Sequence, residues 1–316
     1  MERPSPKLRK QYKTEYSDAS AFAANARLLQ SIWRDEKGIP LKRIYGNFLN
    51  NEQAYCEEAN FLTQKIKDVV KREIEENEFR EGKERKVIKK DRLYENLLAS
   101  QPLAFNLFAE LITPEYELAN KVFRNIFGDR IKNITSIEFE ISPGRGDIKY
   151  IGDRSAFDVF IRYDGLSGKG FIGIEVKYAE TLLDEPATFK PRYKDVAEKS
   201  RKFTEEGIAS LCKMPKSLEQ IWRDHLLSLS MLPPVNAGFD EGFFVYLFPK
   251  ENENCVNALK RYFKFLKTEN QKEFGLHILF MEDLVEEVKI ETDEQWIRDF
   301  EDRYLRFDKI EKLING

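Results

Sequence analysis

Two apolar strand patterns joined by a short glycine-rich segment constrain the fold of this chain more than any other feature. The three segments are FDVFIRY (157–163), DGLSGKG (164–170) and FIGIEVKY (171–178). Side chains in a strand alternate between two faces, so one face is predicted to carry Phe157, Val159, Ile161, Tyr163, Ile172, Ile174, Val176 and Tyr178. The middle segment suits a hairpin loop. The sequence therefore predicts a hairpin with one apolar face and one face that carries Asp158, Glu175 and Lys177.

The expected register of this hairpin brings two acids together. If the hairpin closes symmetrically about Leu166 and Ser167, Asp158 lies almost opposite Glu175. Directly opposed residues have Cβ atoms roughly 5 Å apart, and like charges at that separation are destabilising. A bound metal ion would neutralise the pair.

A third strand pattern, SIEFEIS (136–142), lies just upstream of the hairpin. Its apolar residues alternate with two acids, so Glu140 is a candidate member of the same acidic cluster. The competing interpretation is that Glu175 and Lys177 are ordinary solvent-facing charges, since 34% of the residues are charged.

The spacing of Asp158 and Glu175-Val176-Lys177 resembles the PD-(D/E)XK nuclease superfamily, which has a restriction-endonuclease-like fold. The longer strings SPGRGDIKYIGDRSAFDVFIRY and GFIGIEVKYAE are similar to an uncharacterised bacterial branch of it, and the likeness covers roughly residues 93–290. One position departs from the family pattern: the proline usual before the first Asp is replaced by Phe157.

The resemblance implies an assignment of site residues. Asp158, Glu175 and the backbone carbonyl of Val176 would bind Mg²⁺ or Mn²⁺, with Glu140 as a candidate further ligand. Lys177 would orient or deprotonate the attacking water, and cleavage would leave a 5′-phosphate.

The segment QIWRDHLL (220–227) resembles the Gln-x-x-Arg helix of some family members. Gln220 and Arg223 lie three residues apart and so share a helix face. Gln220 would position Lys177 or water, and Arg223 would meet a phosphate; alternatively, Arg223 pairs with Glu219. The resemblance also implies an acid from the helix before the first strand, for which Glu117, Glu110 and Glu95 are candidates.

Composition excludes several other kinds of site. Cys56, Cys212 and Cys255 are far apart and read as reduced thiols, and with only His225 and His277 a zinc site is not expected. Packing roles are predicted for both histidines. The sequence has no apolar run of membrane-spanning length and no apolar signal core near its start, which predicts a cytoplasmic protein.

The net charge of −3 does not by itself indicate a nucleic-acid binder, but its distribution is uneven. Residues 1–100 carry 21 basic and 17 acidic residues, whereas residues 236–316 carry 12 and 18. Two basic runs, 80–92 and 189–202, could contact phosphates; the alternatives are a solvated helix or linker and a solvated loop. Lys190, Arg192 and Lys194 are the candidate substrate contacts in the second run.

Hydrophobic periodicity predicts an α/β protein with a central mixed sheet of about five strands flanked by helices. The expected helices are 17–34, 51–79, 93–111, 115–127, 217–231, 256–266 and a tail from about 293; the expected strands are 135–142, 155–163, 170–178, 242–248 and 275–281. Residues 1–92 are predicted to form a helical N-terminal region, and residues 93–316 the nuclease-like core with a helical tail, packed as one compact unit.

These features together predict a metal-dependent endonuclease with DNA as the expected substrate. Two other interpretations stay open: a catalytically silent module that binds nucleic acid or protein, and a helical adaptor in which the hairpin is only structural. A homodimer is compatible with the resemblance, because double-strand cutters of this fold often dimerise.

Overall fold

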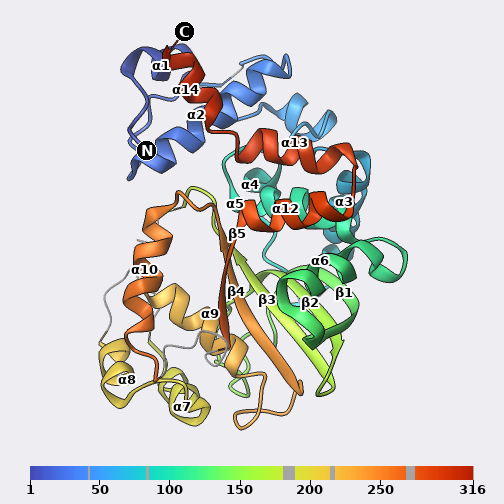
Figure 1. Cartoon of the computed structure of the whole chain (residues 1–316), viewed down its shortest axis with the longest axis vertical. Helices are drawn as coiled ribbons and strands as arrows, with labels where there is room; N and C mark the ends of the chain where they lie inside the picture. Colours follow the sequence, from blue (N-terminus) through green and yellow to red (C-terminus); the bar gives the residue numbers. More distant parts are fainter. Residues whose placement is uncertain (42, 83–84, 181–188, 214–217, 268–274, 316) are drawn as a thin grey trace.

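The centre of the fold is a five-stranded sheet in which neighbours in space are also neighbours along the chain (Figure 1). The computed structural model describes residues 1–41, 43–82, 85–180, 189–213, 218–267 and 275–315. The strands are β1 (Ile131–Ile141), β2 (Phe157–Gly165), β3 (Lys169–Val176), β4 (Glu241–Phe248) and β5 (Leu276–Phe280). The first three strands are antiparallel, and β3, β4 and β5 are parallel. The predicted mixed sheet of five strands flanked by helices is confirmed.

Helices cover both faces of this sheet (Figure 1). Before β1 lie α1 (Pro6–Gln11), α2 (Ala21–Glu36), η1 (Glu52–Cys56), α3 (Gln64–Glu78), α4 (Lys90–Glu95), α5 (Ser100–Phe108), η3 (Ala109–Leu111), η4 (Pro114–Tyr116), α6 (Glu117–Phe127) and η5 (Gly128–Arg130). After β3 lie α7 (Pro191–Ser200), α8 (Glu205–Cys212), α9 (Glu219–Leu229), α10 (Glu253–Phe263), α12 (Met281–Glu291), α13 (Gln295–Tyr304) and α14 (Asp308–Asn315). Among the described residues, no helix has the length and apolar character needed to cross a membrane.

The hairpin register is the one that strand alternation predicted. Val159 lies opposite Ile174, and Asp164 lies opposite Lys169. Val159 and Ile174 pack into a large core with α2, α5 and α13, while Phe160 and Phe171 on the other face pack into a second core with α7, α9 and α10. The charged side of the hairpin is therefore covered by helices instead of facing water.

Phe157 departs from the prediction, which placed its side chain with Val159. Its ring belongs to the second core and stacks near Phe160. The ring lies over Gly173, the β3 partner of Phe160, because a Cβ added to Gly173 would be 2.7 Å from the Phe157 ring. The missing side chain at Gly173 leaves the space that this ring fills.

Several predicted element boundaries were wrong because contacts distant in sequence interrupt the helical pattern. The expected helix 51–79 is divided into η1 and α3, and the expected helix 93–111 is divided between α4 and α5. Between α4 and α5, the chain forms backbone hydrogen bonds with residues 47 and 49 instead of continuing the helix. Helices α1, α7, α8 and α12 were not predicted, and Met281 begins α12 instead of ending β5. Residue 217 of the expected helix 217–231 lies outside the described residues.

Packing links the two ends of the chain. Helix α13 lies against α2, and both termini lie on the same side of the sheet (Figure 1). Arg303 on α13 is fully buried and donates hydrogen bonds to Gln30 Oε1 (3.0 Å) and to the Asn60 carbonyl (2.8 Å). The large core thus takes residues from both sides of the proposed boundary at 92/93.

Candidate functional site

Three carboxylates occupy one row across β1, β2 and β3. Phe139 pairs with Val159 and Ile141 with Phe157, so Glu140 between them lies opposite Asp158. Continuing the β2–β3 register by one residue places Asp158 opposite Glu175. Asp158 Oδ2 accepts a hydrogen bond from the Val176 amide at 2.7 Å, which fixes the Asp158 side chain against β3.

Burial makes this row of carboxylates electrostatically costly. Only 9% of Glu140 and 5% of Glu175 is exposed. Burial, Glu175 and Glu140 together hold the pKa of Asp158 well above its usual range. Burial also raises the pKa of Glu140 to about 7, with a further increase from Glu175, although a hydrogen bond from Gln101 (2.6 Å) opposes the shift. A cation at this position would relieve the repulsion.

Lys177 brings a positive charge to the same place. Its Nζ lies 2.8 Å from Glu175 Oε1, and 7% of the residue is exposed. Burial alone would lower the pKa of Lys177, but the negative charges of Glu175, Glu180 and Asp158 outweigh burial and raise it. Lys177 is thus a buried ammonium group. The interpretation of Glu175 and Lys177 as ordinary solvent-facing charges is wrong.

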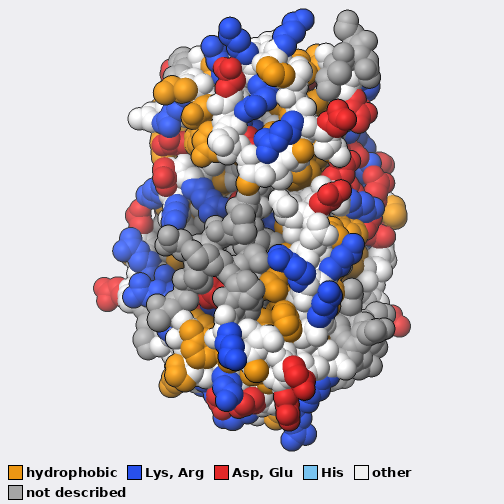
Figure 2. Space-filling model, turned by 90° about the vertical axis from the view of Figure 1, so that its left-hand side faces the viewer, with side chains coloured by type: hydrophobic (Ala, Val, Ile, Leu, Met, Phe, Trp, Pro, Cys, Tyr) orange, Lys and Arg blue, Asp and Glu red, His pale blue; other side chains and the backbone are white. Residues whose placement is uncertain are grey.

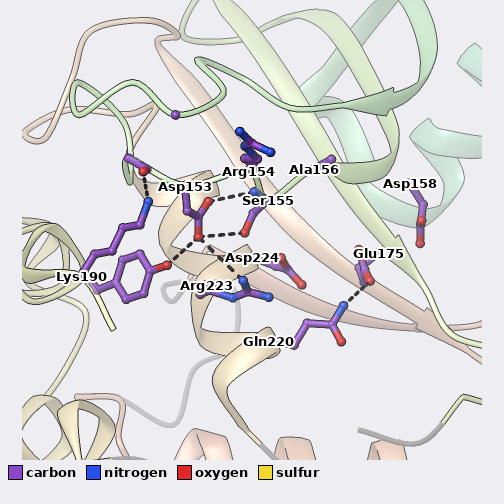
Figure 3. Close-up of a pocket in the computed structure, with 13 residues that line it drawn as sticks. Asp153, Arg154, Ser155, Ala156, Asp158, Glu175, Lys190, Gln220, Arg223 and Asp224 are labelled. Atoms are coloured by element: carbon purple, nitrogen blue, oxygen red, sulfur yellow. Dashed lines mark hydrogen bonds and ion pairs between the residues drawn. The ribbon is translucent and has the colours of Figure 1, made fainter. Parts of the chain in front are cut away.

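Helix α9 supplies a second contact to Glu175. Gln220 Nε2 donates a hydrogen bond to Glu175 Oε1 at 2.8 Å (Figure 3). Lys177 approaches the same oxygen. Gln220 therefore touches the acid of the motif directly.

Arg223, one turn after Gln220 on α9, lies close to two acids. Its guanidinium lies 3.1 Å from Glu219 and 3.9 Å from Asp153. Asp153 in turn accepts hydrogen bonds from Tyr193 (2.7 Å) and from Ser155 (Figure 3). The pairing of Arg223 with Glu219 that the sequence left open is present, but Arg223 also lies at the edge of the cavity described next.

Asp158, Glu175 and Gln220 line a cavity of about 510 Å³. Its lining residues come from the β1–β2 loop, β2, β3, α7 and α9: Gly146, Gly152, Asp153, Arg154, Ser155, Ala156, Asp158, Glu175, Lys190, Tyr193, Gln220, Arg223 and Asp224. The strands contribute the acids Asp158 and Glu175, whereas the loop and α9 each contribute both an acid and an arginine. A phosphodiester needs both kinds of group at a site that cleaves it.

The three candidate substrate contacts of the second basic run differ in their surroundings. Lys190 lines the cavity, and its ammonium group donates to the Gly152 carbonyl. Arg192 donates to the backbone carbonyls of Tyr150 (2.7 Å) and Lys149 (2.8 Å), so it holds the β1–β2 loop. Lys194 lies 3.6 Å from a glutamate one turn along α7, outside this cavity. Most of the run forms helix α7, Pro191–Ser200.

Asp224 is the acid that sequence reasoning missed. It is 3% exposed, and within the described part of the chain its Oδ2 has no hydrogen-bond partner. Burial and the charge of Glu175 hold the pKa of Asp224 well above its usual range, while Arg223 partly opposes the shift. A signal was present, since Asp224 lies four residues after Gln220 and thus on the same helix face.

The upstream glutamates lie elsewhere. Glu95 pairs with Arg43 at 2.6 Å, Glu110 lies 3.4 Å from Lys65, and Glu117 is exposed at the start of α6. The described lining of the cavity includes none of the three. The two histidines lie in packed surroundings, with His225 Nδ1 2.9 Å from the Tyr262 hydroxyl.

The donor set matches a hard divalent cation. In the residues that the structure describes, no group of three or more Asp, Glu, His or Cys side chains is arranged to hold a metal ion. Mg²⁺, however, is usually bound by one or two carboxylates, several waters and substrate phosphates. Asp158 and Glu175 are two such carboxylates, and Asp224 Oδ2, which has no hydrogen-bond partner among the described residues, is a further carboxyl oxygen in the same cavity.

Comparison with known proteins identified one family. The model of the PD-(D/E)XK nuclease superfamily matches residues 16–306. No curated protein and no solved structure matched the chain.

Proposed function

Because the chain belongs to the PD-(D/E)XK nuclease superfamily, we propose that it is a metal-dependent endonuclease that hydrolyses phosphodiester bonds in DNA. The observation that supports this proposal most directly is the row of Glu140, Asp158 and Glu175 on adjacent strands, with the Lys177 ammonium 2.8 Å from Glu175. Asp158 and Glu175 of this row line a cavity that Arg154 and Arg223 also line.

Asp158, Glu175 and the Val176 carbonyl are the proposed ligands of Mg²⁺ or Mn²⁺. In an extended strand, the N–H and C=O of one residue point to the same side. The Val176 amide donates to Asp158, so the Val176 carbonyl is expected to face Asp158 as well. A cation bound there would polarise a phosphoryl oxygen and lower the pKa of an attacking water.

Lys177 has two proposed roles that follow from its charge. As an ammonium group it donates hydrogen bonds, so it can orient a water beside Glu175 and stabilise negative charge that develops on the phosphate. The raised pKa makes proton abstraction by Lys177 unfavourable while it is paired with Glu175. Orientation and charge stabilisation are therefore the roles that the geometry favours.

Gln220 and Arg223 complete the proposed site from the helix side. Gln220 holds Glu175 in place through its amide, which limits the rotamers open to that carboxylate. Arg223 lies at the cavity edge, where its guanidinium could meet a phosphate next to the scissile one. Arg223 would then exchange part of its pairing with Asp153 for the substrate.

A plasmid-nicking assay tests the proposal. Wild-type protein with Mg²⁺ should convert supercoiled plasmid to the nicked or linear form, and EDTA or Lys177→Ala should abolish the conversion. Lys169→Ala is a matched control, because Lys169 is exposed at the other end of the same strand and pairs with Asp164. Nicking that survives both EDTA and Lys177→Ala would refute the mechanism. Duplex binding without any nicking would favour the silent binding module.

A further inference from the structure

Basic side chains gather at one place next to the cavity, although the surface as a whole carries mixed charge. Figure 2 shows Lys and Arg side chains interspersed with Asp and Glu on the face it presents, so neither sign dominates there. The β1–β2 loop (residues 142–156) is different. Two further hollows adjoin it: one shares Gly146 and Arg154 with the cavity, and the other is lined by Glu140 of the carboxylate row.

Both hollows are lined by this loop and by residues from the basic run 80–92. One hollow is lined by Arg80, Arg85, Lys86, Glu138, Glu140, Ile141, Ser142, Gly144, Arg145, Asp147 and Arg162. The other is lined by Gly82, Arg85, Lys86, Val87, Ile88, Arg145, Gly146 and Arg154. Lys83 and Glu84 of the run lie outside the described residues. The fold thus brings a segment more than fifty residues upstream to the edge of the carboxylate row.

Some side chains of the basic run are paired with acids, and others are exposed. Lys86 is buried and paired with Glu73, and its backbone amide and carbonyl both bond the Asn77 side chain. Arg92 is bonded to Glu180 at 2.8 Å. Arg85, by contrast, is exposed, and its carbonyl accepts a hydrogen bond from Arg145. The anchored residues fix the segment so that Arg85 stands at the rim of both hollows.

Arg145 and Arg154 form the part of this rim nearest the acids. Within the described part of the chain, neither forms an ion pair with a carboxylate. Burial lowers the pKa of Arg145, and the charge of Arg154 lowers it further, although Glu140 acts in the opposite direction. The two guanidinium groups therefore repel each other, and an anion between or beside them would remove that cost.

The lining of these hollows also indicates whether a bound nucleic acid would be single-stranded or double-stranded. Proteins that bind single strands stack the bases on aromatic side chains. None of the described residues that line the two hollows is aromatic. A row of arginines without stacking partners suits a duplex, whose bases are already stacked and whose phosphates lie outside.

We propose that Arg85, Arg145 and Arg154 form a phosphate-binding rim that seats the backbone of duplex DNA beside Glu140 and Asp158. The inference rests on the proposed function for the identity of the polymer. It assigns the basic run a defined part: Lys86 anchors the segment through Glu73 and Asn77, and Arg85 contributes to the rim.

Binding measured without metal tests this rim separately from cleavage. Fluorescence anisotropy of a labelled 30-base-pair duplex would be recorded for the full chain in EDTA over a range of salt concentrations. Each lost phosphate contact reduces the slope of log K against log salt by about 0.9. Arg145→Gln with Arg154→Gln should therefore reduce the slope by about 1.8. If the variant and wild type bind equally at 1 M salt, the variant then binds roughly 30-fold more weakly than wild type at 0.15 M.

Two further variants keep the test decisive. Lys121→Gln with Lys132→Gln removes the same charge from two exposed positions. Lys121 lies on α6, and Lys132 lies at the far end of β1, about 26 Å along the strand from Glu140. Binding by this control should equal wild type. Arg154→Gln alone changes an exposed side chain without a described ion pair, so it tests the rim even if the double variant folds poorly, and it should reduce the slope by about 0.9.

The outcomes separate the rim from the nuclease. If the arginine variants keep the wild-type slope, or lose no more affinity than the lysine control, the rim is refuted. Wild-type protein that binds no duplex at low salt would refute it as well. Nicking with unaltered binding by the arginine variants would leave the proposed nuclease standing and remove the rim alone. Arginine-dependent binding without any nicking would support the rim and remove the nuclease.

Discussion

Replacing Glu140 by glutamine should stabilise the metal-free protein at neutral and alkaline pH. Glu140 is 9% exposed and lies in a row with Asp158 and Glu175. Glutamine has nearly the same shape, and its carbonyl oxygen can still accept the hydrogen bond from Gln101. The substitution therefore removes a buried negative charge and leaves the packing in place.

The sign of the effect follows from the direction of the pKa shift. The pKa of Glu140 is raised from 4.5 to about 7 in the folded chain, so the folded state binds this proton more tightly than the unfolded state. The resulting stabilisation is complete below pH 4.5 and is lost as the pH rises through about 7. A shift of 2.5 units at about 1.4 kcal/mol per unit corresponds to roughly 3 kcal/mol.

Urea unfolding in EDTA at a series of pH values between 5 and 8 measures this loss. Wild-type protein should lose free energy of unfolding across the range, and Glu140→Gln should lose roughly 3 kcal/mol less. Glu117→Gln, on an exposed residue at the start of α6, should follow the wild-type curve. Parallel curves for wild type and Glu140→Gln would show that the charge on Glu140 is not what makes this site costly, and would refute the electrostatic reasoning.

Three further outcomes are expected. Calorimetry should detect Mn²⁺ binding that Asp158→Asn and Glu175→Gln abolish and that Asp164→Asn, at the far end of β2, leaves unchanged; binding retained by the first two variants would exclude the proposed ligands. Gln220→Ala should slow nicking about tenfold at unchanged KM, because hydrogen bonds to charged groups contribute roughly 1.5–3 kcal/mol; a wild-type rate would show that this amide does not position Glu175. Arg303→Leu should lower the free energy of unfolding by roughly 3 kcal/mol, because buried oxygen acceptors lose their donors; unchanged urea unfolding would contradict the role of Arg303 in joining the chain ends.

The sequence was sufficient to predict the hairpin and its register. Alternation and loop length alone placed Asp158 opposite Glu175, because both depend on residues close together in the chain. Alternation also suggested Glu140 on β1, but it breaks at that residue, where φ is +54° and Ile141 packs against the second core while Phe139 lies in the first. Local geometry therefore predicts the pairing of Asp158 with Glu175, whereas the position of Glu140 also depends on how β1 pairs with β2 beyond the β1–β2 loop.

The rest of the site depends on contacts between segments far apart in the chain. Asp224 comes from a helix whose orientation toward β3 is decided by how α9 packs on the second core. Arg85 reaches Arg145 across sixty residues through an anchor at Lys86. The periodicity within each segment shows which residues share a face, but it does not show which distant segment that face contacts. Phe157 illustrates the same limit, because its ring occupies the space next to Gly173 on a neighbouring strand.

Net charge is a poor guide to what this protein binds, because the relevant charges are local and opposed. A chain of net charge −3 disfavours nucleic acid at long range. The acids of the site are buried and close together, where a cation is needed, while Arg145 and Arg154 stand beside them without acidic partners among the described residues. Screening leaves interactions beyond about 8 Å weak at physiological salt. A phosphate at the rim would therefore interact with the arginines there far more strongly than with the acidic C-terminal third. A metal ion would offset the negative charge of the acids beside the rim.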